Sequence, residues 1–119
     1  MFIKKTIRSL VFAFRGIGYM VKNERNFKIH LFFAVLIIFI GLLVGFNRYD
    51  WMIVILLIAV ILSAEIFNSA LERICDLMKI KLKLKYEDTT IIRNLSAGAV
   101  IIIALFSLLI GIILIIGLL

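Results

Sequence analysis

The longest uncharged stretch of this chain is the 25-residue run Leu95–Leu119. A helix of about 20 residues crosses the ~30 Å hydrocarbon core of a bilayer, so this run is long enough for one tilted membrane span. Of the 119 residues, 65% are hydrophobic, whereas a soluble domain is about 45–50% apolar. The sequence therefore predicts an all-α integral membrane protein. It excludes an ordinary soluble enzyme, a disordered tail and a disulfide-rich secreted module.

Two further apolar runs can cross a membrane only if they take polar residues with them. Leu31–Phe46 becomes long enough when Lys28 extends its ammonium group to the interface. Trp51–Ala64 has only 14 residues, so its helix must carry Glu65 and Asn68 into or near the membrane. We therefore predict a single membrane domain, 1–119, with transmembrane helices over 27–46, 50–75 and 92–117.

The basic residues predict which side of the membrane each connection faces. Seven of the 14 Lys and Arg residues lie in 1–28, one lies in the polar turn 47–50, and six lie between Arg73 and Arg93. Because cytoplasmic connections carry the excess of Lys and Arg, the N-terminus and the 76–93 connection should be cytoplasmic. This indicates a multi-pass protein of the bacterial cytoplasmic (inner) membrane. Its net charge of +7 then favours anionic lipid headgroups as partners and not nucleic acid.

The first 25 residues have the pattern of an amphipathic helix and not of a cleaved signal peptide. Apolar side chains recur every three or four residues, at Ile3, Ile7, Leu10, Phe14, Ile17 and Val21. Basic side chains occupy another face, at Lys4, Arg8, Arg15 and Lys22. We predict that residues 1–25 form an interfacial helix on the cytoplasmic surface.

Three acids and an amide at the end of the second predicted span form the strongest chemical signal. Glu65, Asn68, Glu72 and Asp76 are separated by 3, 4 and 4 residues, which places them within about 80° of one helix face. An ionisable group inside a span costs roughly 2.5–3.5 kcal/mol on insertion scales, so such a face marks a candidate functional site.

Carboxylate and amide oxygens are the ligands that Mg²⁺ prefers, and Mg²⁺ held by one or two carboxylates is typical of phosphoryl transfer. A further acid at membrane depth could take a proton from a lipid hydroxyl. Glu24 is the only acid in the first 49 residues and lies at the depth expected for Glu72, so the two could share a cation. From spacing alone, a structural polar seam and a proton or cation path remain open alternatives.

The stretch Glu65-x-x-Asn68-Ser-Ala-x-Glu72-x-x-x-Asp76 resembles the signature of the small trimeric prokaryotic lipid kinases, the diacylglycerol kinase and undecaprenol kinase family. The resemblance extends through 13–17, 24–30 and 96–100 and so covers nearly the whole chain. The segment Asn26–His30 is more similar to the undecaprenol kinase branch. The resemblance implies a homotrimer of three-span subunits, each with an N-terminal surface helix. It also implies transfer of the γ-phosphate of MgATP to a lipid alcohol, with undecaprenol expected first and diacylglycerol second.

The resemblance also implies residue roles. Glu24 and Glu72 would hold Mg²⁺ with the ATP phosphates, Glu65 would be the general base on the lipid hydroxyl, and Asn68 would orient phosphate or substrate. The nucleotide pocket would be formed by Arg15, Glu24, Glu72, Asp76, Arg93 and Asn94.

One position departs from the family pattern, because Arg93-Asn94 stands where the family ordinarily has Lys-Asp. Arginine keeps the positive charge but has a different hydrogen-bonding geometry, so a weakened kinase, an altered substrate and an inactive relative are all compatible with the sequence. The preceding segment, Lys79–Tyr86, alternates basic and apolar residues, which predicts an extended strand-like connection. His30, at the interface end of the first span, is interpreted as a packing or headgroup contact.

Overall fold

The computed structural model describes residues 1–119 and is almost entirely helical. Its elements are α1 (Phe2–Asn23), α2 (Arg25–Val44), α3 (Arg48–Lys81), the 3₁₀ helix η1 (Tyr86–Thr89) and α4 (Thr90–Leu118). Three helical segments are long and apolar enough to cross a membrane: α2, α3 and the η1–α4 segment. This confirms the prediction of an all-α membrane protein.

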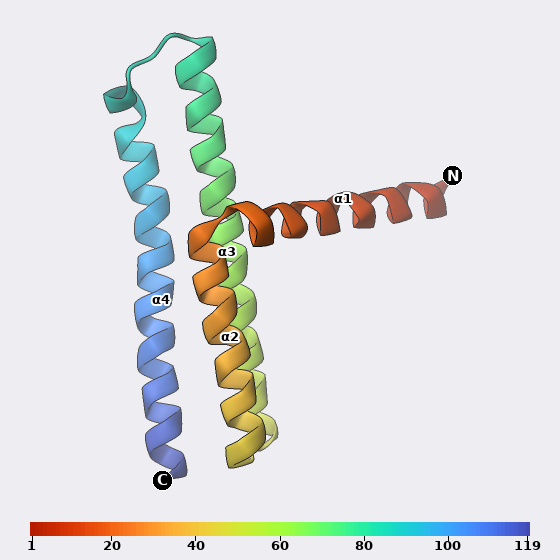
Figure 1. The fold of residues 1–119 in the computed structure, drawn as a ribbon, viewed down its shortest axis with the longest axis vertical. Coiled ribbons are helices and arrows are strands. Elements are labelled where there is room, and N and C mark those ends of the chain that lie inside the picture. Colours follow the sequence, from red (N-terminus) through yellow and green to blue (C-terminus); the bar gives the residue numbers. More distant parts are fainter.

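Helix α3 is the central element of the bundle. It packs against both α2 and α4, and α1 points away from the three long helices (Figure 1). At 1.5 Å per residue, the 34 residues of α3 span about 51 Å, which exceeds the ~30 Å hydrocarbon core. The last turns of α3 and the adjoining η1 therefore have to extend beyond the hydrocarbon into the headgroup region or water.

Most large apolar side chains of the long helices point outward. Phe32, Leu56 and Leu105 are each at least 60% exposed, and only 13 of 119 residues are buried. A soluble monomer rarely exposes more than a few hundred Å² of contiguous apolar surface. This outward apolar surface matches a lipid solvent, in which exposed leucine and phenylalanine are not penalised.

The turn between α2 and α3 is closed by backbone conformation, capping and aromatic packing. Gly45 ends α2 with φ of 87°, a left-handed conformation that favours glycine. Asn47 Oδ1 accepts from the Asp50 N–H at 2.9 Å, and Asp50 Oδ2 accepts from the Asn47 N–H at 3.0 Å. This reciprocal cap starts α3 at Arg48, so the turn lies at 45–47 and not at 47–50 as the sequence suggested.

The connection between α3 and α4 differs from the sequence prediction. Residues 79–81 are not extended: α3 continues through Lys81, and the chain turns only at 82–85 before η1. Continuing the helix adds a backbone hydrogen bond per residue, and Lys79 and Lys81 in its last turn complement the negative end of the helix dipole. Lys83 then reverses the chain with φ of 55°.

Glu24 separates α1 from α2 in an extended backbone conformation. Met20 and Phe27, on either side of it, are among the most deeply buried side chains. Arg73 of α3 donates to the Tyr19 hydroxyl of α1 at 3.3 Å. These contacts tie the α1–α2 junction to α3, whereas α1 is otherwise exposed. The position of α1 on a membrane surface stays a prediction.

We expect Gly41→Ala to destabilise the fold by about 1–3 kcal/mol, the usual range for overpacking. A methyl group on Gly41 would overlap the Phe46 ring and come within 2.9 Å of Trp51. Gly111→Ala in α4 is the matched control, because its methyl group would meet nothing within 4 Å. Thermal unfolding in detergent should show a lower midpoint for the first variant only. Equal midpoints for both variants would contradict the packing described here.

Candidate active site

Four polar side chains of α3 share one face, which is buried at one end and exposed at the other. Glu65 is 2% exposed and Asn68 is 6% exposed, while Glu72, one turn further on, is half-buried. Asn68 Nδ2 donates to Glu72 Oε1 at 3.4 Å. Asp76 ends the face with a side chain that is 58% exposed. We call Glu65, Asn68, Glu72 and Asp76 the acidic face. It runs from the interior of the bundle to solvent along a single helix.

Glu65 is surrounded by ionisable groups from other elements. His30 of α2 places Nε2 3.9 Å from Glu65 Oε2. Glu24, at the α1–α2 junction, and Glu72 are both close enough for their charges to act on the Glu65 carboxylate. The fold therefore brings Glu24, from the α1–α2 junction, to Glu65 and Glu72 on α3. Repulsion among these three acids favours a cation between them.

The oxygen atoms in this region fit a hard divalent cation. Asn68 Oδ1 and Ser69 Oγ are buried and have no hydrogen-bond partner within the chain. Carboxylate and amide oxygens suit Mg²⁺. No group of three or more His, Cys, Asp and Glu side chains is close enough to hold a metal ion. A cation bound here would therefore have to complete its coordination with phosphate oxygens or water.

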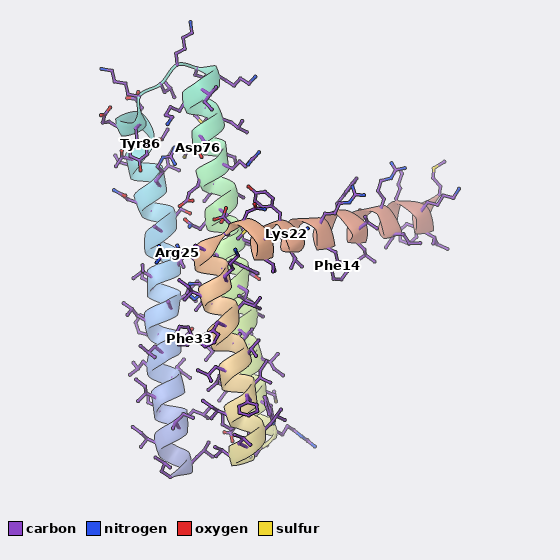
Figure 2. The ribbon with its side chains drawn as sticks, viewed as in Figure 1. Phe14, Lys22, Arg25, Phe33, Asp76 and Tyr86 are labelled. Carbon is purple, nitrogen blue, oxygen red and sulfur yellow. The ribbon has the colours of Figure 1, made fainter.

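A second cluster lies where α3 meets η1 and α4. Arg93 donates from a terminal nitrogen to Asp76 Oδ1 at 2.8 Å and from Nε to Thr89 Oγ1 at 2.9 Å. Its guanidinium lies 4.8 Å from the centre of the Tyr86 ring. Figure 2 shows Asp76 and Tyr86 near one another at the end of the bundle beyond α1. We call Asp76, Tyr86, Thr89 and Arg93 the arginine cluster. It joins the acidic face to the α3–α4 connection.

Two residues predicted for the nucleotide pocket lie outside these clusters. Arg15 is exposed on α1, where its guanidinium contacts only the Phe12 ring of the same helix, at 5.9 Å. Asn94 follows Arg93 but its side chain is exposed. Within one chain, the structure joins Asp76 to Arg93 and gathers Glu24, Glu65, Asn68 and Glu72. It does not bring Arg15 to either set.

Sequence analysis missed three residues at these sites. His30 was interpreted as a packing or headgroup contact, yet it pairs with the most deeply buried acid. One feature of the sequence could have indicated this contact: His30 is an ionisable residue expected at the same membrane depth as Glu65. Thr89 and Tyr86 precede Arg93 by four and seven residues, the spacing of one helix face. This spacing would have predicted the contacts if residues 86–93 had been recognised as helical.

The geometry suits chemistry between a lipid and a water-soluble substrate. A buried carboxylate at one end of the acidic face can act on a group that arrives from the bilayer. The exposed end carries an arginine and an aspartate that can meet a charged molecule from water. Phosphoryl transfer depends mainly on positioning and charge neutralisation, so a few acids, an amide and an arginine are sufficient protein groups for it.

Comparisons with known proteins agree with this chemistry. A sequence model described as prokaryotic diacylglycerol kinase matches residues 11–115. The undecaprenol kinase of Bacillus subtilis is 34% identical over 109 residues, which cover 92% of this chain and 86% of that protein. The diacylglycerol kinase of Synechocystis is 28% identical over 87% of this chain and 58% of its own length. No solved structure gives a significant match.

We expect Arg93→Met to increase tryptic cleavage in the 82–85 turn about fivefold. The variant removes the links to Asp76 and Thr89 that hold the connection to α3, so the turn should open more often and be cleaved faster. Arg73→Met, which loses a contact to α1 instead, is the matched control and should leave the cleavage rate unchanged. The measurement is limited proteolysis in detergent with mass analysis of the fragments. Equal rates for the two variants would show that the arginine cluster does not hold the turn.

Proposed function

This chain belongs to the prokaryotic diacylglycerol kinase family and is an ATP-dependent membrane lipid kinase, and from this premise we propose that its acceptor is undecaprenol. The more similar of the two relatives described above is an undecaprenol kinase. Diacylglycerol is the second candidate, because the other relative is a diacylglycerol kinase. The observation that carries the proposal is the acidic face, which runs from buried Glu65 to exposed Asp76 along α3. A lipid hydroxyl and a nucleotide could therefore approach the same helix from opposite ends.

Glu65 is the proposed general base. Its carboxylate accepts the proton of the acceptor hydroxyl as the hydroxyl oxygen attacks the γ-phosphorus. The bond from that phosphorus to the bridging oxygen breaks, and ADP leaves. Asn68 lies one turn along the same face and donates to Glu72, while its Oδ1 is free to contact phosphate-bound groups or substrate. Burial of Glu65 excludes water that would otherwise compete with the lipid hydroxyl.

Glu24 and Glu72 are the residues that we propose to hold Mg²⁺. Both lie close to Glu65, and the unpaired Asn68 Oδ1 adds a further oxygen on the same face. When bound, Mg²⁺ would neutralise negative charge on the ATP phosphates. The two glutamates come from the α1–α2 junction and from α3, so this role depends on the packing that places Glu24 beside α3.

The nucleotide is proposed to lie at the exposed end of the acidic face. Asp76 and Arg93 already form an ion pair there, and Asn94 extends from the next position of α4. Arg15 lies far along α1 from these residues, so its proposed role requires another copy of the chain. We propose a homotrimer in which subunits share the site.

In this arrangement α1 lies on the cytoplasmic surface of the bacterial inner membrane among anionic headgroups. The proposal rests on the predicted amphipathic pattern of 1–25 and on the excess of Lys and Arg in 1–28 and 73–93. The same orientation places the arginine cluster in the cytoplasm, where ATP is available.

We expect purified protein in mixed micelles to transfer the γ-phosphate of MgATP to undecaprenol faster than to diacylglycerol. The measurement is transfer of labelled phosphate to a panel of lipid alcohols at matched mole fraction. A protein that phosphorylates none of them would be an inactive member of the family. Faster transfer to diacylglycerol would instead reverse the order of the two acceptors.

Glu65→Gln and Glu72→Gln should impair the reaction in different ways. We expect Glu65→Gln to lose at least 100-fold in turnover while it still binds MgATP, because general-base catalysis contributes about 10²–10⁴-fold. Glu72→Gln should also weaken MgATP binding, since it removes a proposed metal ligand. Nucleotide binding and turnover are measured on the same preparations. Full turnover by Glu65→Gln would reject its role as base, and unchanged MgATP affinity in Glu72→Gln would reject the metal assignment.

A further inference from the structure

His30 is the one basic side chain within ion-pair distance of the proposed base. Its Nε2 lies 3.9 Å from Glu65 Oε2, and the second ion pair of the structure, between Asp76 and Arg93, lies elsewhere. The His30 side chain is 20% exposed, whereas that of Glu65 is 2% exposed. The two residues come from different helices, so their contact also joins α2 to α3 beside the acidic face.

His30 also lies at one end of an apolar groove of about 630 Å³ between α2, α3 and α4. Figure 1 shows α4 running alongside α2 and α3, with α2 overlapping α3 in this view. His30 is the only ionisable residue that lines the groove, and Ser107 is the only other residue with a polar side chain there. The apolar lining of the groove fits a hydrocarbon chain.

Glu65 follows directly from this groove along α3. The groove is lined by Val54, Leu57, Ile58 and Ile61 of that helix. Ile61 precedes Glu65 by four residues, so the two side chains share one helix face. A lipid whose chain occupies the groove would therefore bring its polar end towards His30 and Glu65.

The position of the Glu65 carboxylate needs a restraint. Glu24 and Glu72 both repel it, whereas His30 and the Asn68 side-chain amide stabilise its charge. Asn68 lies on the same helix as Glu65 and also donates to Glu72, so His30 is the one stabilising group that faces Glu65 from another helix. A base that can rotate away from the acceptor loses much of its effect, because a displacement of about 1 Å can cost 10²-fold in rate.

We propose that His30 is a positioning residue of the kinase reaction, which holds the Glu65 carboxylate against α2 at the end of the apolar groove. His30 stays at one carboxylate oxygen while the other accepts the proton of the lipid hydroxyl. The inference rests on the proposed role of Glu65 as the base. It adds that α2 contributes to catalysis through the one basic side chain beside Glu65.

The test compares His30→Ala, His30→Gln and the control Ser63→Ala with the native chain in lipid nanodiscs. We expect His30→Ala to lower kcat for the lipid alcohol about 10–100-fold, while KM for MgATP changes less than twofold. His30→Gln should retain more activity than His30→Ala, because its amide keeps an N–H group facing Glu65. Added imidazole should restore part of the activity of His30→Ala, by binding in the space beside the groove. Ser63→Ala, at an exposed position of α3 that lines neither the groove nor the acidic face, should keep the native kcat and not respond to imidazole.

A double variant separates positioning from a purely structural role. In the Glu65→Gln background, His30→Ala should cause no further loss of kcat, because His30 acts through Glu65. An additive loss would overturn the inference, as would native kcat in His30→Ala. A loss that is equal in both His30 variants and insensitive to imidazole would also overturn it. If His30→Ala does not fold, as judged by its unfolding midpoint, the comparison of His30→Gln alone and in the Glu65→Gln background decides the matter.

These results are distinguishable from failure of the proposed function. If the native chain transfers phosphate to no lipid alcohol, the proposed acceptor class is rejected without reference to His30. If the native chain is active and Glu65→Gln keeps full turnover, the base assignment fails. When the native chain is active and Glu65→Gln is not, the His30 variants test only the positioning role.

Discussion

The structure depends on the burial of polar side chains, Glu65 above all, on the central helix. Glu65 and Asn68 are among the most deeply buried residues of the chain, although most of its leucine, isoleucine and phenylalanine side chains face outward. In water this distribution would be inverted, because apolar burial is the main favourable term in folding. In a bilayer the apolar surface is at no disadvantage, whereas a carboxylate exposed to hydrocarbon is costly. The helices therefore pack around their polar residues.

The same constraint explains the arrangement of the other elements. α3 can carry its acidic face only if α2 and α4 cover it, and both helices pack against α3. The extended residue at Glu24 lets α1 leave the bundle while Met20 and Phe27 remain buried at the junction. This junction places an acid from the N-terminal part of the chain beside α3. At the other end of the face, Arg93 joins α4 to Asp76, so both ends of the acidic face are held by neighbouring segments.

Helical periodicity carried most of what sequence reasoning could predict about the site. A spacing of 3, 4 and 4 residues places Glu65, Asn68, Glu72 and Asp76 on one face of any helix, so their alignment needed no tertiary information. The contacts from other elements could not be derived in this way. His30 is 35 residues from Glu65 in sequence, and nothing in its local pattern distinguishes a headgroup contact from a contact with a buried acid.

The prediction of an extended segment over Lys79–Tyr86 failed for a related reason. Alternation is a weak signal over so few residues, and the hydrogen bonds of a helix already 30 residues long favour its continuation.

Local composition alone decided that this chain crosses a membrane with three helices and that one helix carries an acidic face. Those properties follow from transfer free energies and from the helical repeat, which depend on neighbouring residues only. Tertiary structure decided which acids meet, that His30 lies against Glu65, and that Arg93 pairs with Asp76 while Arg15 remains apart. These outcomes depend on how helices pack and where the chain bends at Glu24. The packing is set by contacts between segments that are distant in sequence, so no local pattern predicts it.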